Sequence, residues 1–242
     1  MAIDFKKALE MVKERGLFQG ISRFKYNGNG YDLNESLQLV EAIGKQRNPN
    51  FVIDDENRFT YENIIKWLHC DETMKAIHPE TKQEVPGDMY RGIYIAGNTG
   101  SGKSWCMEVM LVYADLFHFK IKYGESDSRI WWRIARADEI VAKFVETTSI
   151  DEYKKNKLLC IQDFGAEQLE AVAMGNRMNV LRTLLEYRGD RSDCLTMITS
   201  NYSLKNPTLT ESYGERVTSR LMEMCNYFEI KGKDRRKLQV TM

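Results

Sequence analysis

Residues 97 to 104 form a complete phosphate-binding loop of the pattern G-x-x-x-x-G-K-S/T, with the sequence Gly97-Asn98-Thr99-Gly100-Ser101-Gly102-Lys103-Ser104. A triphosphate needs many N–H donors that converge on one point, and a small glycine-rich turn lets the backbone wrap that closely. We expect Gly97 and Gly102 to shape the turn. Lys103 is expected to reach the β- and γ-phosphates, and the Ser104 hydroxyl to ligate Mg²⁺. The loop predicts that the protein binds a nucleoside triphosphate together with Mg²⁺.

A second polar position follows the apolar stretch from Leu158 to Ile161 and consists of Gln162 and Asp163. An acid at the end of such a strand holds Mg²⁺, usually through water, and a second carboxylate beside it can polarise the attacking water. If Gln162 takes the metal-side position, one charge is missing and hydrolysis is expected to be slow. If Asp163 takes that position, the water-activating carboxylate is missing, unless Glu167 supplies it.

Two further polar sets follow along the chain. Asn201 comes after the apolar stretch that ends at Ile198, where its side chain could lie between the γ-phosphate and the attacking water or simply form a turn. Arg216 and Arg220 are four residues apart in a helical pattern, so that they share one face. Two aligned guanidinium groups could enter a neighbouring subunit's site and stabilise charge on the transferred phosphoryl group. A solvated pair of arginines is an equally good interpretation.

The elements that would position these residues alternate from residue 90 onward. The patterns predict strands at 91–96, 129–135, 157–162, 194–199 and 227–231, and helices at 103–117, 137–147, 176–188 and 213–224. Short apolar strands that alternate with helices indicate a three-layer α/β P-loop core with a parallel sheet. Ligands of such folds contact the carboxyl ends of the strands, which is where the polar residues above fall.

The first 85 residues contain helical patterns and no recognisable motif. Apolar stripes run over residues 5–12, 33–40 and 61–68. Asp32 and Glu35 form a plausible capping pair before the second stripe, and Thr60 is a candidate N-cap for the third. We therefore divide the chain into a small helical N-terminal region, residues 1–85, and a P-loop core, residues 86–242.

The composition gives the chain no global electrostatic field, since 35 Lys and Arg residues balance 35 Asp and Glu residues. The absence of a secretory signal and of any apolar run near the ~20 residues that span a membrane predicts a cytoplasmic protein without a membrane partner. The basic residues that could contact DNA are interpreted as solvated surface: Lys154, Lys155, Lys157, Arg182, Arg188 and residues 231–237.

The order of these stretches resembles the DnaC/IstB-like branch of the AAA+ ATPases. That branch includes bacterial and phage helicase loaders and the ATPase subunits of some transposition systems. The resemblance covers residues 90–237 and is carried beyond the phosphate loop by Leu158–Glu167 (LLCIQDFGAE), Met197–Tyr202 (MITSNY) and Gly214–Leu221 (GERVTSRL). The family usually has Asp where this chain has Gln162, which places rapid hydrolysis in question and leaves nucleotide binding intact.

The resemblance also implies roles for individual residues. Asn201 is similar to the first sensor, Arg220 (with Arg216 as second choice) to the arginine finger that acts in trans, and Arg236 to the second sensor. Only residues 237–242 follow Arg236, so there is no room for the C-terminal helical lid of most AAA+ proteins.

The leading hypothesis from this resemblance is an ATP-controlled helicase loader. Its subunits would assemble on single-stranded DNA, each completing the next site with Arg220, and residues 1–85 would bind a replicative helicase. An alternative is a transposition ATPase that binds duplex DNA and recruits a transposase. A third is a small-molecule P-loop kinase, for which neither an acceptor pocket nor an arginine-rich lid is evident in the sequence.

Overall fold

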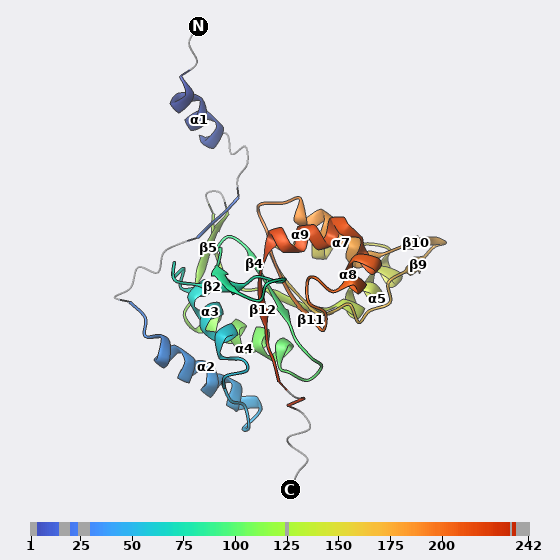
Figure 1. The fold of residues 1–242 in the computed structure, drawn as a ribbon. Helices are drawn as coiled ribbons and strands as arrows, with labels where there is room; N and C mark the ends of the chain where they lie inside the picture. Colours follow the sequence, from blue (N-terminus) through green and yellow to red (C-terminus); the bar gives the residue numbers. More distant parts are fainter. Residues whose placement is uncertain (1–3, 15–19, 24–29, 124–125, 233, 236–242) are drawn as a thin grey trace.

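A five-stranded parallel sheet with the strand order β12-β4-β11-β8-β7 forms the centre of the computed structural model (Figure 1). The structure describes residues 4–14, 20–23, 30–123, 126–232 and 234–235. The strands are β4 (Gly92–Ala96), β7 (Arg133–Arg136), β8 (Leu158–Phe164), β11 (Leu195–Ser200) and β12 (Cys225–Glu229). Strands β4, β8 and β11 are buried over nearly their whole length, as expected for a parallel sheet covered on both faces.

Helices cover both faces of this sheet and produce three layers (Figure 1). Successive side chains of a strand point to opposite faces, so Ile93 and Ile95 of β4 join one core and Tyr94 joins the other. The first core contains α4 (Lys103–Leu116) together with helices of the N-terminal region. The second contains residues from α5 (Ala137–Thr147), α6 (Asp151–Lys155), α7 (Val180–Gly189), α8 (Pro207–Tyr213) and α9 (Glu215–Met224).

The N-terminal region shares its core with the sheet. It contains α1 (Phe5–Glu14), β1 (Ile21–Arg23), α2 (Leu33–Arg47), α3 (Arg58–Leu68), β2 (Lys75–Ile77) and β3 (Glu84–Pro86). Val40 of α2 and Ile64 of α3 belong to the same buried cluster as Met110 of α4 and Ile93 of β4. The packing therefore continues across residue 85, and the division of the chain at this point stays a prediction.

Of the two helix caps predicted in the N-terminal region, one is confirmed and one is wrong. Asp32 caps α2, since its side chain accepts from the backbone N–H groups of Asn34 and Glu35. Thr60 is not a cap, because α3 begins at Arg58 and Thr60 lies buried inside it, donating from Oγ1 to the Glu229 carbonyl. The short strands β1, β2 and β3 were not predicted, since three residues are too few for a sequence pattern.

Two interruptions alter the predicted elements of the core. The helix expected from residue 176 begins at Val180, because β9 (Ala171–Ala173) and β10 (Asn176–Met178) pair as an antiparallel hairpin. The helix expected over 213–224 is divided into α8 and α9 at Gly214, whose φ of 84° is unfavourable for other residues.

The strand expected over 129–135 is also divided. Its first residue ends β6 (Ser126–Arg129), which pairs with β5 (Lys120–Tyr123) outside the main sheet, and its last part is β7. Among residues 230–232 and 234–235, which follow β12, none is helical. No helix in the described part of the chain is both long and apolar enough to cross a bilayer.

Candidate nucleotide-binding site

The phosphate loop joins the carboxyl end of β4 to the first turn of α4. Gly100 and Gly102 have φ values of 76° and 101°, in the left-handed region that glycine adopts without strain. A Cβ at Gly97 would lie 2.2 Å from the carbonyl oxygen of Ile230, so only glycine fits there. Helix α4 begins at Lys103 directly after the loop, so its N-terminal N–H groups face the loop, where they favour an anion.

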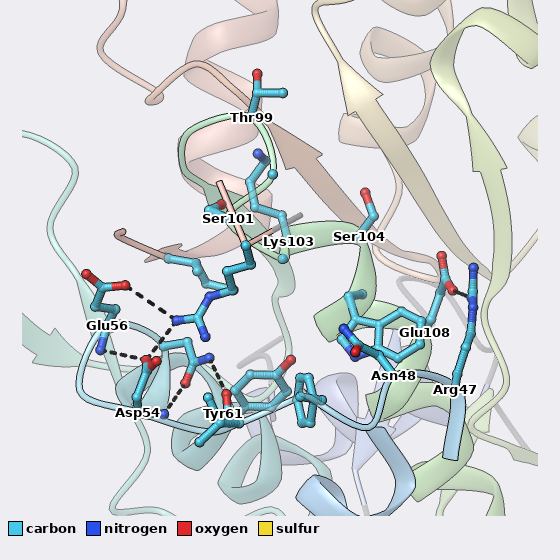
Figure 2. Close-up of a pocket in the computed structure, with 18 of the residues that line it drawn as sticks. Arg47, Asn48, Asp54, Glu56, Tyr61, Thr99, Ser101, Lys103, Ser104 and Glu108 are labelled. Atoms are coloured by element: carbon cyan, nitrogen blue, oxygen red, sulfur yellow. Dashed lines mark hydrogen bonds and ion pairs between the residues drawn. The ribbon is translucent and has the colours of Figure 1, made fainter. Parts of the chain in front are cut away.

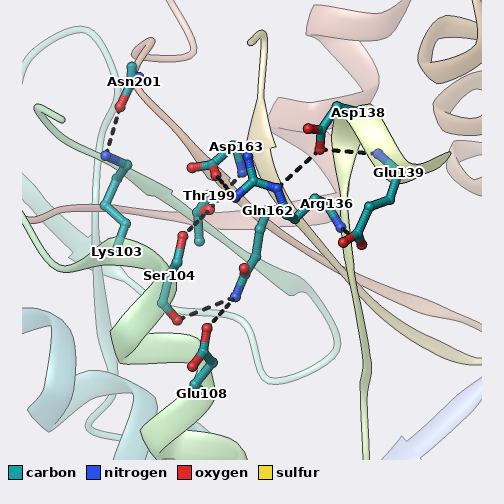
Figure 3. Close-up of polar contacts among 10 residues, drawn as sticks. All are labelled: Lys103, Ser104, Glu108, Arg136, Asp138, Glu139, Gln162, Asp163, Thr199 and Asn201. Carbon is teal, nitrogen blue, oxygen red and sulfur yellow. Dashed lines mark hydrogen bonds and ion pairs between the residues drawn. The ribbon is translucent and has the colours of Figure 1, made fainter. Parts of the chain in front are cut away.

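Lys103 connects the loop to the end of β11. The side chain is 5% exposed, and its Nζ donates at 2.8 Å to the carbonyls of Gly97 and Asn98 and to Oδ1 of Asn201. Figure 3 shows the contact between Lys103 and Asn201. The predicted first sensor thus lies within hydrogen-bond distance of the phosphate-loop lysine. Ser101 Oγ is buried in the loop without a hydrogen-bond partner among the described residues, which leaves a polar group available for a ligand.

Gln162, and not Asp163, lies beside Ser104 at the start of α4. The buried Gln162 side chain donates from Nε2 to the Ser104 carbonyl at 3.4 Å and to Glu108 Oε1 at 3.3 Å, both on α4 (Figure 3). The Ser104 hydroxyl lies 3.5 Å from Thr199 Oγ1. Which of the two residues takes the metal-side position stays a prediction, and the geometry brings Gln162 to Ser104.

Asp163 is turned away from Gln162 by a β-bulge. Ile161 pairs with Ile198 but Phe164 pairs with Ser200, so β8 has one more residue here than β11. Asp163 has a φ of 56°, which Asp tolerates better than most residues. Its carboxylate lies 3.5 Å from the Arg136 guanidinium, and its N–H donates to Thr199 Oγ1. Asp163 still lines the cavity, as Lys103 does.

Glu167 points into the protein core. Its carboxylate accepts hydrogen bonds from the Gly165 N–H at 2.9 Å and from the Tyr213 hydroxyl, and only 8% of the residue is exposed. Burial and this carboxylate hold the pKa of Tyr213 far above its ordinary value, so Tyr213 remains a donor. Glu167 does not line the cavity. This placement does not supply the water-activating carboxylate considered from the sequence.

Arg216 and Arg220 lie on α9, outside the cavity of their own chain. Asp190 holds both, at 3.1 Å from the Arg216 guanidinium and 2.5 Å from that of Arg220. Glu223 also pairs with Arg220 at 2.9 Å. The structure does not bring either arginine to the phosphate loop of the same subunit.

Arg236, the predicted second sensor, lies outside the described residues, but its neighbour Arg235 lines the cavity. The Arg235 N–H donates to the Gly100 carbonyl at 3.0 Å. Its guanidinium lies 2.8 Å from Asp54 and 3.5 Å from Glu56. Sequence reasoning missed Arg235, because no pattern fixes the position of a residue that follows the last strand of the sheet.

The cavity has a second wall that the sequence did not indicate. It encloses about 870 Å³ between the phosphate loop and residues 47–57 of the N-terminal region (Figure 2). Phe51 and Val52 bring apolar surface to this wall, and Trp105 of α4 lies beside them. Asn57 braces it by accepting from the Asp54 N–H and donating to the Val52 carbonyl. A wall of this kind beside a phosphate loop suits the base and sugar of a nucleotide.

The donor set of the cavity fits ATP and Mg²⁺. Ser104 Oγ and the Asp163 carboxylate line the cavity and offer oxygen atoms, which Mg²⁺ prefers. The buried Gln162 amide lies behind them, in contact with the Ser104 carbonyl. No group of three His, Cys, Asp or Glu residues that could hold a metal occurs in the described ranges. Mg²⁺ in such a site is completed by phosphate oxygens and water.

Arg188 corrects one expectation about the surface. It was interpreted as part of a solvated basic face but is 1% exposed. Its guanidinium donates to Thr196 Oγ1 and to the carbonyls of Tyr153, Asn156 and Leu195. Arg188 therefore holds α6, α7 and β11 together and is not available to a nucleic acid.

No protein-family model and no curated protein matches this sequence. Among solved structures, the chain is similar to the DnaC helicase loader with a TM-score of 0.51 and 17% identity, over 76% of this chain and 95% of that chain. It is also similar to the replication initiator DnaA bound to AMPPCP and single-stranded DNA, with a TM-score of 0.46 and 17% identity, over 76% of this chain and 49% of that chain. The likeness to DnaC confirms the predicted three-layer α/β fold with a parallel sheet.

Proposed function

We propose that this protein is an ATP-controlled loader of a replicative helicase, which assembles on single-stranded DNA. The observation that carries the proposal is the nucleotide cavity, whose two walls are the phosphate loop and residues 47–57 of the N-terminal region. A bound nucleotide would contact both parts of the chain and could control how the N-terminal region meets a partner. The DnaC structure, to which the fold is similar, is that of a helicase loader.

The residues of the cavity have distinct tasks in this proposal. The loop N–H groups and Lys103 bind the phosphates, and Lys103 exchanges its contact with Asn201 for a phosphate oxygen. Asn201 then orients a water molecule toward the γ-phosphate. Mg²⁺, when bound, neutralises charge on the β- and γ-phosphates. Since Gln162 offers no charge, ATP serves as a switch on assembly, for which slow hydrolysis is sufficient.

The arrangement of α9 supports assembly through a trans-acting arginine. Arg216 and Arg220 share one side of α9 and are held there by Asp190, away from the cavity of their own subunit. In the proposed assembly, Arg220 of one subunit completes the site of the next and stabilises charge on the transferred phosphoryl group.

Helix α1 is the proposed docking element for the helicase. In Figure 1 it stands apart from the sheet. Its apolar residues Phe5 and Leu9 are 76% and 62% exposed, on the same face of the helix. An amphipathic helix with an open apolar face is suited to a groove on a partner protein.

The test is a pull-down from the native host's lysate, with the wild type and the Lys103→Ala variant as baits, in ATP and in ADP. We expect the wild type to recover a hexameric replicative helicase in amounts that depend on the nucleotide, and Lys103→Ala to lose this dependence. Lys120→Ala, which removes an exposed lysine outside the cavity, is the matched control and should behave as the wild type.

Other outcomes point elsewhere. Recovery of a transposase, together with a preference for duplex over single-stranded DNA, would replace the loader with a transposition ATPase. Nucleotide binding with no protein or DNA partner, and stabilisation by a nucleoside monophosphate, would favour a small-molecule kinase.

A further inference from the structure

The glutamine beside Ser104 has an acidic neighbour on α4. Glu108 follows Ser104 by one helical turn, so the two side chains lie on the same face of the helix. Glu108 lines the nucleotide cavity with a side chain that is 33% exposed. Its Oε1 accepts a hydrogen bond from Gln162 Nε2 at 3.3 Å, and its Oε2 lies 2.6 Å from the Arg47 guanidinium.

These contacts fix which atom of the Gln162 amide faces α4. Both N–H groups of Nε2 are directed at α4, one to the Ser104 carbonyl and one to Glu108 (Figure 3). An amide has two donors on nitrogen and acceptors on oxygen only. With the nitrogen used on α4, the oxygen Oε1 is the polar atom left to coordinate a metal ion or to accept a hydrogen bond from the ion's water.

Glutamine at position 162 can make hydrogen bonds to Glu108 that an aspartate or glutamate at this position could not make. A carboxylate at position 162 cannot donate to Glu108 or to the Ser104 carbonyl, and its charge would lie against the Glu108 charge. The donor on Gln162 is therefore complementary to the acceptor on Glu108. The negative charge that position 162 lacks is carried by Glu108, which contacts Gln162 and also pairs with Arg47.

We propose that Glu108 and Gln162 act as one unit on the metal side of the nucleotide site, where Glu108 supplies the charge and holds the amide with its oxygen toward Mg²⁺. Glu108 is a positioning residue in this unit. The inference rests on the nucleotide binding in the proposed function and is independent of helicase loading. It explains how a chain without the usual acid at this position keeps a metal-dependent site.

The experiment measures Mn²⁺ binding to the nucleotide-bound protein by the loss of the free-ion signal in electron paramagnetic resonance. The variants are Glu108→Gln, Gln162→Glu and the combination of both, which exchanges the two groups at unchanged length and total charge. Glu211→Gln, on the exposed face of α8, is the matched control. Affinity for a fluorescent ATP analogue in excess EDTA shows in each case whether the site itself is intact.

We expect Glu108→Gln to weaken Mn²⁺ binding roughly ten- to a hundredfold with little change of nucleotide affinity in EDTA. Gln162→Glu alone should fail to improve Mn²⁺ affinity, because it places two carboxylates in contact. The exchanged pair should recover the wild-type affinity to within about threefold, a coupling that independent residues do not show. The inference would be overturned if Glu108→Gln kept the wild-type Mn²⁺ affinity, or if the effects of the two substitutions were additive. Either result would leave the proposed function standing. Absence of nucleotide binding by the wild type would overturn it together with the proposed function.

Discussion

Arg235 connects the phosphate loop with the opposite wall of the cavity. Its backbone N–H donates to the Gly100 carbonyl, and its guanidinium pairs with Asp54 and Glu56 on the opposite wall. Burial acts to raise the pKa of Asp54, but the hydrogen bond and charge of Arg235 outweigh it and lower that pKa. The Arg235 guanidinium therefore lies in the cavity, beside the Asp54 and Glu56 carboxylates, where we expect it to contact a bound triphosphate.

We expect Arg235→Ala to weaken ATP binding by about tenfold or more, since hydrogen bonds to charged groups contribute about 1.5–3 kcal/mol. ADP binding should change less, because the γ-phosphate is absent. Titration of fluorescent ATP and ADP analogues measures both, with Arg91→Ala outside the cavity as the control. Unchanged ATP affinity would return the second-sensor role to Arg236.

At the scale of elements, β4 must lie close to β11 for the loop and Asn201 to meet. Gly92, at the start of β4, permits this approach, because a Cβ there would lie 1.9 Å from the Thr196 carbonyl oxygen. The obstacle is backbone and cannot rotate away. Gly92→Ala should lower the free energy of unfolding by about 1–3 kcal/mol, as overpacking does. Thermal unfolding checks this against Gly20→Ala, whose Cβ would make ordinary contacts of 3.4 Å and more; equal stability of both variants would contradict it.

A buried histidine connects α2, α3 and α4. His69, at the end of α3, contacts the Tyr113 hydroxyl of α4 at 2.8 Å, and Tyr113 donates to Ser36 Oγ of α2. Burial lowers the pKa of His69 from 6.5 to about 4, although Asp71 acts in the opposite direction. The unfolded chain thus binds this proton at a higher pH than the folded chain does, and protonation favours unfolding.

Stability is therefore expected to fall as the pH decreases from about 6.5 toward about 4. His69→Phe should show a smaller loss over this interval, because one of the groups that drive it is gone. Urea unfolding at a series of pH values measures the two slopes. Parallel curves for the wild type and the variant would show that His69 is not the group responsible.

At the scale of the whole molecule, the separation of α9 from the cavity predicts that the active form contains more than one subunit. Arg220→Ala should leave ATP affinity near that of the wild type but reduce hydrolysis per subunit, up to roughly a thousandfold for an arginine finger. Mixing it with Lys103→Ala should restore hydrolysis, since each variant keeps what the other lacks. Arg182→Ala, on α7, is the control. No recovery on mixing would exclude Arg220 as the trans-acting residue, and the same series would then be run on Arg216.

Local patterns in the sequence determined the loop and most of the elements of the core. Residues 97–104 identify the phosphate site from sequence alone. The glycines act through their backbone freedom and Lys103 through the length of its side chain, and neither property depends on distant residues. The positions of β4, β8, β11 and α4 agree with the predictions within a few residues, since burial on both faces leaves uninterrupted apolar runs. These features depend on residues that are close in the sequence, so they can be predicted without knowledge of the tertiary structure.

The tertiary structure alone decided how the polar residues are used. The bulge at Asp163 places Gln162 beside Ser104, and a hydrogen bond from Tyr213 turns Glu167 into the core. The second wall at residues 47–57 joins segments that are about fifty residues apart in the sequence. Each outcome is set by contacts between distant residues, whose cost or gain depends on burial and on the direction of each side chain. A pattern of residue types along one strand or helix does not contain that information.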